Sequence, residues 1–323
     1  MPKKLHELID KSIHAEYCYK KAKVTRALEN PNSAELDLLY QMVGAQMAQV
    51  NPPLILPYVE VCISPQCTLH CRDCANFMQH YDKPKPMDLA AVKSWIDALL
   101  ESVDHILTFR VMGGEPLMQK QLPELMAYLI PLSKLQHIQI VTNGTLKPRD
   151  ELVQLLRGNT KTSIFFSNYG PKLAPHYQEY VQFCLDNQIL VQSVRPDIKW
   201  FDMGDTHNRN LSPERLDQVY AQCPNNCRHL WNGELHHCPR SAHGRYLGYI
   251  TDLPDTHYVD LLRYNAQERR ERLKIFYEIP YTQACDHCGF ADGLKLVDCA
   301  IQVERTKHKK GKGIPVEGKR HPR

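Results

Sequence analysis

Three closely spaced cysteines are the feature of this sequence that points most directly to chemistry. Cys67, Cys71 and Cys74 lie in the stretch CTLHCRDC, four and then three positions apart. Three thiolates on one short loop can bind three corners of a cubane iron–sulfur cluster, whose normal complement is four cysteines. The fourth iron then stays open to another ligand, and an open position distinguishes a reactive metal site from a structural one.

Most of the other cysteines are clustered as well. The chain contains 12 cysteines, with a second group at residues 223–238 and a pair at residues 285–288. The first 24 residues are charged and lack the apolar core of a signal peptide. No apolar run approaches the roughly 18 residues of a membrane span. We therefore expect a cytoplasmic protein, in which disulfides are rare and clustered cysteines indicate metal binding.

An alternation of strand and helix patterns must position these cysteines. Apolar runs predict strands at residues 54–64, 105–112, 137–145, 161–168 and 189–195, and a helical period predicts helices at residues 87–102, 121–130, 149–158 and 175–188. Asp88 is a suitable N-cap for the first of these helices. Repeated strand–helix units predict a parallel sheet with helical crossovers, either open or curled into a barrel. The cysteine loop then follows the first strand, and GGEP follows the second.

Other parts of the chain depart from this alternation. Residues 1–50 are expected to form a helical extension, and residues 304–323 a basic, disordered tail. The alternation stops near residue 215, which predicts a core domain over residues 51–215 and a smaller domain over residues 216–303. The net charge of +4 is too small to indicate nucleic-acid binding. We expect neither nucleic acid nor a membrane as a partner.

The Cys-x3-Cys-x2-Cys loop and the GGEP segment together resemble the radical S-adenosylmethionine (radical SAM) superfamily. The resemblance implies an α/β fold, a partial (β/α)6 TIM-like barrel. It also implies that Cys67, Cys71 and Cys74 ligate a [4Fe–4S] cluster whose open iron binds S-adenosylmethionine (SAM). In this family, one-electron reduction cleaves SAM to methionine and a 5′-deoxyadenosyl radical, which abstracts hydrogen from a substrate.

The GGEP segment is the first candidate for further contacts to SAM. Gly113 and Gly114 lack a Cβ, so backbone carbonyls can approach a ligand closely. Glu115 offers a negative charge to the SAM ammonium, and Pro116 completes the motif. Other candidates end successive predicted strands, where a role in the turn is the alternative: Asn143, Ser167, Asn168 and Arg195.

One position departs from the family pattern. Many members carry an aromatic residue just before the last cysteine, near the adenine, whereas this chain has Asp73. Phe77 is the nearby aromatic residue that would substitute.

The later cysteines resemble the Twitch domain, a shortened SPASM extension of radical SAM enzymes. The pattern is Cys223-x9-Gly233-x4-Cys238, a long gap, and Cys285-x2-Cys288. The resemblance implies that these four cysteines hold one auxiliary [4Fe–4S] cluster. Cys223 fits the spacing and Cys227 does not, so Cys223 is preferred as the fourth ligand. A structural Zn²⁺ ion is the alternative, because four cysteines also suit tetrahedral zinc.

Enzymes of this kind often oxidise or epimerise their substrates. The stretch CRHLWNGELHHCPR is similar to radical SAM proteins associated with sugar, aminocyclitol and glycan modification, which favours a small polar substrate. Flavodoxin or ferredoxin is the family's usual electron donor. Maturation of a ribosomal peptide is an alternative, and a non-catalytic iron–sulfur or zinc scaffold is another. The unassigned thiols that could return a hydrogen atom in an epimerisation are Cys184, Cys227 and Cys299.

Overall fold

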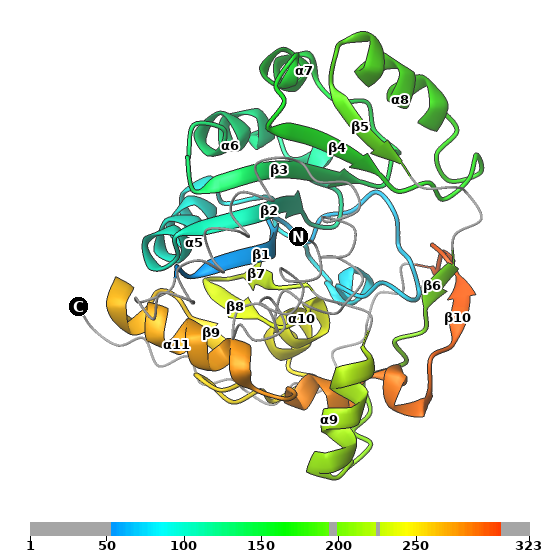
Figure 1. The fold of residues 1–323 in the computed structure, drawn as a ribbon. Coiled ribbons are helices and arrows are strands. Elements are labelled where there is room, and N and C mark those ends of the chain that lie inside the picture. The colour runs from blue at the N-terminus through cyan, green and yellow to red at the C-terminus, as the bar shows by residue number, and fades with distance from the viewer. Residues whose placement is uncertain (1–52, 194–198, 224–226, 305–323) are drawn as a thin grey trace, which may run out of the picture.

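The computed structural model describes residues 53–193, 199–223 and 227–304. The expected N-terminal helices, Arg195 and nearly all of the expected tail lie outside these residues. The described part is a mixed α/β structure built on one large, mostly parallel sheet (Figure 1). The predicted fold class is confirmed.

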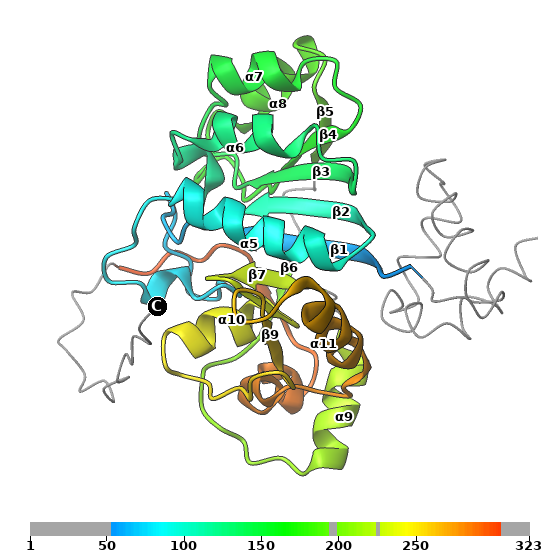
Figure 2. The ribbon, with the colours of Figure 1, turned by 90° about the vertical axis from the view of Figure 1, so that its left-hand side faces the viewer.

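Five strands of the expected alternation form the parallel half of the sheet. They pair in the order β5-β4-β3-β2-β1, and every pair is parallel. The helices between consecutive strands are the crossovers that such pairing requires (Figures 1 and 2). The strands are β1 (Ile55–Cys62), β2 (His105–Met112), β3 (Leu135–Thr142), β4 (Thr162–Phe166) and β5 (Leu190–Ser193), and the helices are α5 (Leu89–Ser102), α6 (Leu122–Leu129), α7 (Asp150–Leu156) and α8 (Tyr177–Asp186).

The chain beyond residue 215 returns to the same sheet. β7 (His229–Trp231) pairs in parallel with β1, and β8 (Glu234–His236) and β9 (Tyr258–Asp260) continue the sheet antiparallel. Among the described residues the sheet therefore runs from β5 to β9 and is open. The remaining helices are α9 (Pro213–Gln222), α10 (Pro239–Tyr246) and α11 (Ala266–Glu278).

A small second sheet and short 3-10 turns complete the described structure. β6 (Lys199–Phe201) pairs antiparallel with β10 (Leu296–Asp298), and this ribbon lies beyond the carboxyl ends of the main strands (Figure 1). The 3-10 turns are η1 (Met78–His80), η2 (Pro116–Met118), η3 (Gln283–His287) and η4 (Gly289–Asp292).

The two faces of the parallel strands differ in polarity because side chains alternate along a strand. Val59, Phe109 and their neighbours on one face are buried in the apolar core. On the other face, Glu60, Arg110 and Gln139 lie in register on β1, β2 and β3. Arg110 Nε donates to Gln139 Oε1 (2.6 Å).

Helix α5 begins as the sequence predicts. The Asp88 side chain accepts a hydrogen bond from the backbone N–H of Ala91 (3.2 Å), which satisfies one of the free N–H groups of the first turn. Leu89, Val92 and Ile96 then follow one face of the helix into the core.

Arg269 joins the C-terminal half of the chain to this helix. Its buried guanidinium donates to Ser102 Oγ (2.8 Å), to the carbonyls of Leu261 (3.0 Å) and Tyr264 (2.6 Å), and to the Glu101 carboxylate. Removal of this side chain would leave buried acceptors without a donor.

We expect Arg269→Met to lower the free energy of unfolding by about 2–4 kcal/mol, because the hydrogen bonds from a buried charge are lost. Urea unfolding under anaerobic conditions measures this change. Gln267→Ala, at an exposed position of the same helix, is the control and should shift it by less than about 0.5 kcal/mol. Equal effects of the two substitutions would contradict the role given to Arg269.

None of the described helices is both long enough and apolar enough to cross a bilayer.

Candidate active site

The loop after β1 places its three cysteines beside one cavity. Cys67, Cys71 and Cys74 all line a cavity of about 300 Å³ at the carboxyl ends of β1, β2 and β3. This is the edge at which parallel α/β folds bind ligands. The sequence therefore predicted both the grouping of these thiols and their position at a strand end.

Gly113 and Gly114 line the same cavity and allow the cysteine loop to pack on the end of β2. A Cβ on Gly114 would lie 2.3 Å from the carbonyl oxygen of Gln66 and 2.7 Å from Cys67 Cβ. A Cβ on Gly113 would lie 2.5 Å from the carbonyl oxygen of Ser64. The cysteine loop thus makes the closest approach to these glycines. Room for this loop is a second reason for glycine at both positions, in addition to the close approach of a ligand expected from the sequence.

Glu115 is turned into the protein, where it organises the neighbouring strand ends. The carboxylate is 1% exposed and accepts from Thr142 Oγ1 (2.8 Å) and from the backbone N–H groups of Asn143 (2.7 Å) and Leu117 (3.0 Å). Burial raises the pKa of Glu115 to about 7, although these three donors act in the opposite direction. Pro116 is buried at the start of η2. The predicted contact of Glu115 with the SAM ammonium stays a prediction.

The other strand-end candidates differ in their positions. Asn143 and Ser167 line the cavity, and Asn143 Nδ2 donates to Thr68 Oγ1 (3.0 Å) and lies 3.7 Å from Cys67 Sγ. Asn168 is buried, and its side chain accepts from the backbone N–H of Gly170 (3.0 Å), as expected for a turn residue. Of the described candidates, Asn143 and Ser167 are thus available to a ligand in this cavity.

Aromatic side chains also line the cavity, and sequence reasoning did not select them. Tyr169 and Trp200 border it, with ring centroids 5.5 Å apart. Phe77 borders a neighbouring cavity, where the Arg240 guanidinium lies 4.6 Å from the centre of its ring. Asp73 lines both cavities and forms a salt bridge with Arg72 (2.9 Å).

A C-terminal segment, residues 300–303, pairs with the cysteine loop. The backbone N–H of Arg72 donates to the carbonyl of Ile301 (2.8 Å), and that of Val303 donates to the carbonyl of His70 (2.9 Å). The Gln302 side chain accepts from the backbone N–H of His70 (2.7 Å). Its Nε2 donates to Cys71 Sγ (3.2 Å). No signal in the sequence joined residue 302 to this loop.

We expect Gln302→Leu to weaken retention of a metal cluster by about 10–100-fold, since partners of metal ligands contribute on this scale. The loss of a hydrogen bond to sulfur should also make the cluster's reduction potential more negative. Iron release to a chelator and a redox titration followed by electron paramagnetic resonance measure the two effects. The control is Gln182→Leu, on the exposed side of α8, which should behave as wild type.

The donor set of the loop fits an iron–sulfur cluster. Burial raises the pKa of Cys67 and of Cys71 to about 12, and the charge of Cys74 acts in the same direction on both. Without a cation these groups are therefore thiols. Metal binding offsets the free-energy cost of deprotonating these thiols and releases their protons. The hydrogen-bond donors near Cys67 and Cys71 would stabilise negatively charged sulfur ligands.

The later cysteines meet around a second cavity. Cys223, Cys238, Cys285 and Cys288 line a small cavity of about 40 Å³. Burial raises the pKa of Cys238 well above its ordinary value, and the charges of the other three cysteines raise it further. Arg240 borders the same cavity and donates to the carbonyl of His287 (2.8 Å).

The three unassigned thiols lie in different surroundings. Cys227 is not among the residues that line the second cavity. Cys184 is fully buried in the apolar core on α8. Cys299 directly precedes residues 300–303, the segment that pairs with the cysteine loop.

A third cavity of about 490 Å³ lies between the two cysteine sites. Cys74 borders both this cavity and the first one, and Arg240 borders both this cavity and the second one. Its polar lining includes Asp73 and Asp202 together with Arg72.

The fold and the site together define an α/β protein with a cavity at the strand ends, beside a loop that carries three cysteines. Residues 61–167 match the family described as the Radical SAM superfamily, and this match contains the three cysteines and GGEP. The chain therefore contains a radical SAM domain, and the resemblance inferred from the motifs is confirmed. The family implies a [4Fe–4S] cluster and SAM.

Similar proteins of known activity match over short stretches only. The GTP 3',8-cyclases of Syntrophomonas wolfei and Helicobacter pylori strain 26695 are each 28% identical over 94 residues. The chain spans 27% and 29% of their respective lengths, and the matched stretch is 28% of this chain.

Solved structures that match this chain at low sequence identity include SuiB and BtrN, each bound to SAM. Streptococcus suis SuiB bound to S-adenosylmethionine is 20% identical, with a TM-score of 0.36 over 53% of this chain and 42% of SuiB. BtrN in complex with AdoMet and 2-DOIA is 17% identical, with a TM-score of 0.46 over 72% of this chain and 92% of BtrN.

Proposed function

We propose that this protein is a radical SAM enzyme that oxidises or epimerises a small polar substrate, such as a sugar, an aminocyclitol or a glycan precursor. The observation that carries the proposal is the cavity of about 300 Å³ lined by Cys67, Cys71 and Cys74 within a radical SAM domain. When bound there, a reduced cluster and SAM supply a 5′-deoxyadenosyl radical that abstracts hydrogen.

The residues of this chain would hold the cofactor at the strand ends. The three cysteines ligate the cluster, and the backbone at Gly113 and Gly114 borders the space that SAM would occupy. Asn143 and Ser167 offer side-chain hydrogen bonds, and the rings of Tyr169 and Trp200 offer a surface on which an adenine can pack. This assignment gives the adenine contact to these rings rather than to Phe77.

The second cysteine site is proposed to bind an auxiliary [4Fe–4S] cluster. Cys223, Cys238, Cys285 and Cys288 line one cavity, which supports the choice of Cys223 over Cys227 as the fourth ligand. Burial raises the pKa of the Cys288 thiol, and the nearby charge of Arg240 acts in the opposite direction, so Arg240 favours sulfur in its anionic form. Such a cluster would accept an electron from the substrate in an oxidation.

The substrate is proposed to bind in the cavity of about 490 Å³ between the two cysteine sites. This volume lies in the range of small-molecule sites. The carboxylates of Asp73 and Asp202 can accept hydrogen bonds from hydroxyl or amino groups. A substrate held there is next to Cys74 on one side and Arg240 on the other. If the reaction is an epimerisation, Cys299 is our first candidate for the hydrogen donor, because it directly precedes the segment that pairs with the cysteine loop.

The test is the formation of 5′-deoxyadenosine, followed by mass spectrometry. The protein is reconstituted anaerobically and given SAM with dithionite, or with flavodoxin or ferredoxin as the physiological type of electron donor. We expect 5′-deoxyadenosine to form. Transfer of deuterium into it from a labelled aminocyclitol or sugar would identify the substrate class.

Two other results would assign a different function. Deuterium transfer from a precursor peptide, and from no small molecule, would identify a peptide maturase. Zinc in place of iron, with no cleavage of SAM under any condition, would identify a non-catalytic metal-binding scaffold.

A further inference from the structure

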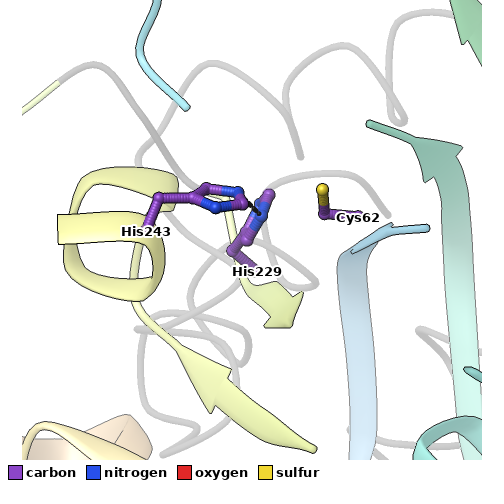
Figure 3. Close-up of side chains that lie close together, drawn as sticks. All are labelled: Cys62, His229 and His243. Carbon is purple, nitrogen blue, oxygen red and sulfur yellow. Dashed lines mark hydrogen bonds between the residues drawn. The ribbon is translucent and has the colours of Figure 1, made fainter. Parts of the chain in front are cut away.

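A third group of side chains that could ligate a metal lies outside the lining of both cysteine cavities. Cys62 ends β1, His229 begins β7 and His243 lies on α10, and all three side chains are buried. One ligand atom from each, a sulfur and two ring nitrogens, lie within 4.8 Å of one another. Figure 3 shows the two imidazoles facing each other, with Cys62 beside them at the end of its strand.

The sheet brings these residues together. Glu60 of β1 pairs with His229 of β7, and side chains two apart on a strand share a face. Glu60, Cys62 and His229 are therefore on one face, and α10 packs over it with His243 turned inward. Because β7 and α10 follow β1 by more than 160 residues, the group exists only in the folded chain.

Each histidine is hydrogen-bonded through Nδ1, the ring nitrogen that does not face the other histidine. His229 Nδ1 lies 2.8 Å from the Glu60 carboxylate, which also accepts from Tyr58 Oη (2.8 Å). His243 Nδ1 lies 2.7 Å from Tyr81 Oη. A carboxylate or hydroxyl on one ring nitrogen is the usual support of a histidine that binds metal through the other. Here the other ring nitrogens, the two Nε2 atoms, face each other at a hydrogen-bond distance of 3.0 Å.

The spacing is close to the needs of one tetrahedral ion. With metal–nitrogen bonds of about 2.0–2.1 Å and a metal–sulfur bond of about 2.3 Å, ligand atoms lie about 3.3–3.6 Å apart. The two nitrogens are 3.0 Å apart and the three ligand atoms lie within 4.8 Å of one another, so binding requires the side chains to adjust around the ion. One thiolate and two imidazoles form a ligand set that favours binding of zinc over magnesium or calcium.

A metal-free arrangement is also chemically complete. If His229 donates from Nδ1 to Glu60, its Nε2 is a hydrogen-bond acceptor. His229 Nε2 can then accept a hydrogen bond from the N–H at His243 Nε2, provided that Tyr81 donates to His243 Nδ1. Cys62 Sγ can then keep its contact to the Ser64 carbonyl (3.7 Å). The two arrangements differ in one measurable property, which is whether an ion is bound by one sulfur and two nitrogens.

We propose that Cys62, His229 and His243 bind one Zn²⁺ ion, separate from the iron–sulfur sites. The ion would tie β7 and α10 to the end of β1, five residues before the first cysteine of the loop. It would thus hold the C-terminal half of the chain against the strand that carries the radical SAM site. The fourth position would be left to a water molecule or a further ligand.

X-ray absorption at the zinc edge tests the proposal on the full chain. The protein is reconstituted with iron and sulfide, so that the other cysteines are occupied, and is then supplied with one equivalent of Zn²⁺. We expect one sulfur at about 2.3 Å and two imidazole nitrogens at about 2.0–2.1 Å. A shell of four sulfurs, or zinc that a desalting column removes, would overturn the assignment.

Binding of Co²⁺, which is visible in the absorption spectrum, can be compared between variants. Co²⁺ added to the same protein should give a thiolate-to-metal charge-transfer band that Zn²⁺ abolishes at one equivalent. The band should be lost in Cys62→Ser and kept in Cys184→Ser, which alters another buried cysteine that lines none of the cavities. Persistence of the band in Cys62→Ser would place the bound ion elsewhere.

A second variant covers the case in which Cys62→Ser does not fold. His243→Gln removes one nitrogen ligand and leaves the thiol in place. We expect its affinity for Co²⁺ to fall at least tenfold while its iron content is unchanged. An affinity equal to that of the wild type would contradict the role of His243 as a ligand.

Discussion

Replacement of Cys71 with alanine is expected to abolish cleavage of SAM, with 5′-deoxyadenosine falling at least 1000-fold to the detection limit. Two thiolates remain on the loop, and a cubane cluster held by fewer than three protein ligands is not retained. Cys71 also lies against Gln302, so its loss removes the contact between the loop and residues 300–303. Mass spectrometry of the nucleoside product and the iron content per chain measure the outcome.

Cys285→Ala is the matched variant at the second cysteine site. It should lose a similar amount of iron but keep the cleavage of SAM measurable, because the first cavity and its three cysteines are unchanged. Turnover of the substrate should fall strongly, since an auxiliary cluster is the proposed electron acceptor. Loss of the first cluster in both variants to the same extent would refute the assignment of two separate sites.

Gly114→Ala is expected to disrupt the first site without removing any ligand. The new methyl group would lie 2.3 Å from a backbone oxygen and 2.7 Å from Cys67 Cβ, and neither atom can move without displacing the cysteine loop. Overpacking of this kind costs about 1–3 kcal/mol or more. We expect iron content at the first site and SAM cleavage to fall at least tenfold, as measured by iron analysis and by product formation.

Gly158→Ala separates this effect from a general loss of stability. Gly158 has a φ of +66°, so alanine is strained there, but its Cβ would come no closer than 3.9 Å to another group. It should lower the free energy of unfolding by about 1 kcal/mol and leave the iron content unchanged. If Gly114→Ala resembled Gly158→Ala in iron content, the steric role of Gly114 would be wrong.

Much of the radical SAM domain was predictable because it is encoded locally. The strand before the cysteine loop, helix α5 with its Asp88 cap, and the alternation up to β5 depend on short periodic patterns. The three cysteines lie within eight residues, so any loop brings them together. The motif at residues 113–116 follows the next parallel strand, whose carboxyl end must meet the same edge of the sheet.

Other features depend on contacts between segments far apart in the chain, which no local pattern records. β7 has three residues, too few to show a period, and its pairing with β1 extends the core sheet past the boundary expected at residue 215. The bond from Gln302 to Cys71 joins positions 231 residues apart. The inward turn of Glu115 depends on donors from the neighbouring strand end.

The sequence by itself thus determined the resemblance to the radical SAM superfamily, because the three cysteines of the first site lie within eight residues and their spacing is specific. Only the tertiary structure decided which distant groups surround that site. It brings Cys223 rather than Cys227 to the second cavity, and it joins Cys62 to two histidines that appeared unrelated to it. The physical reason is that burial and strand pairing select neighbours by shape and hydrogen bonding across the whole fold, whereas a motif records only neighbours along the chain.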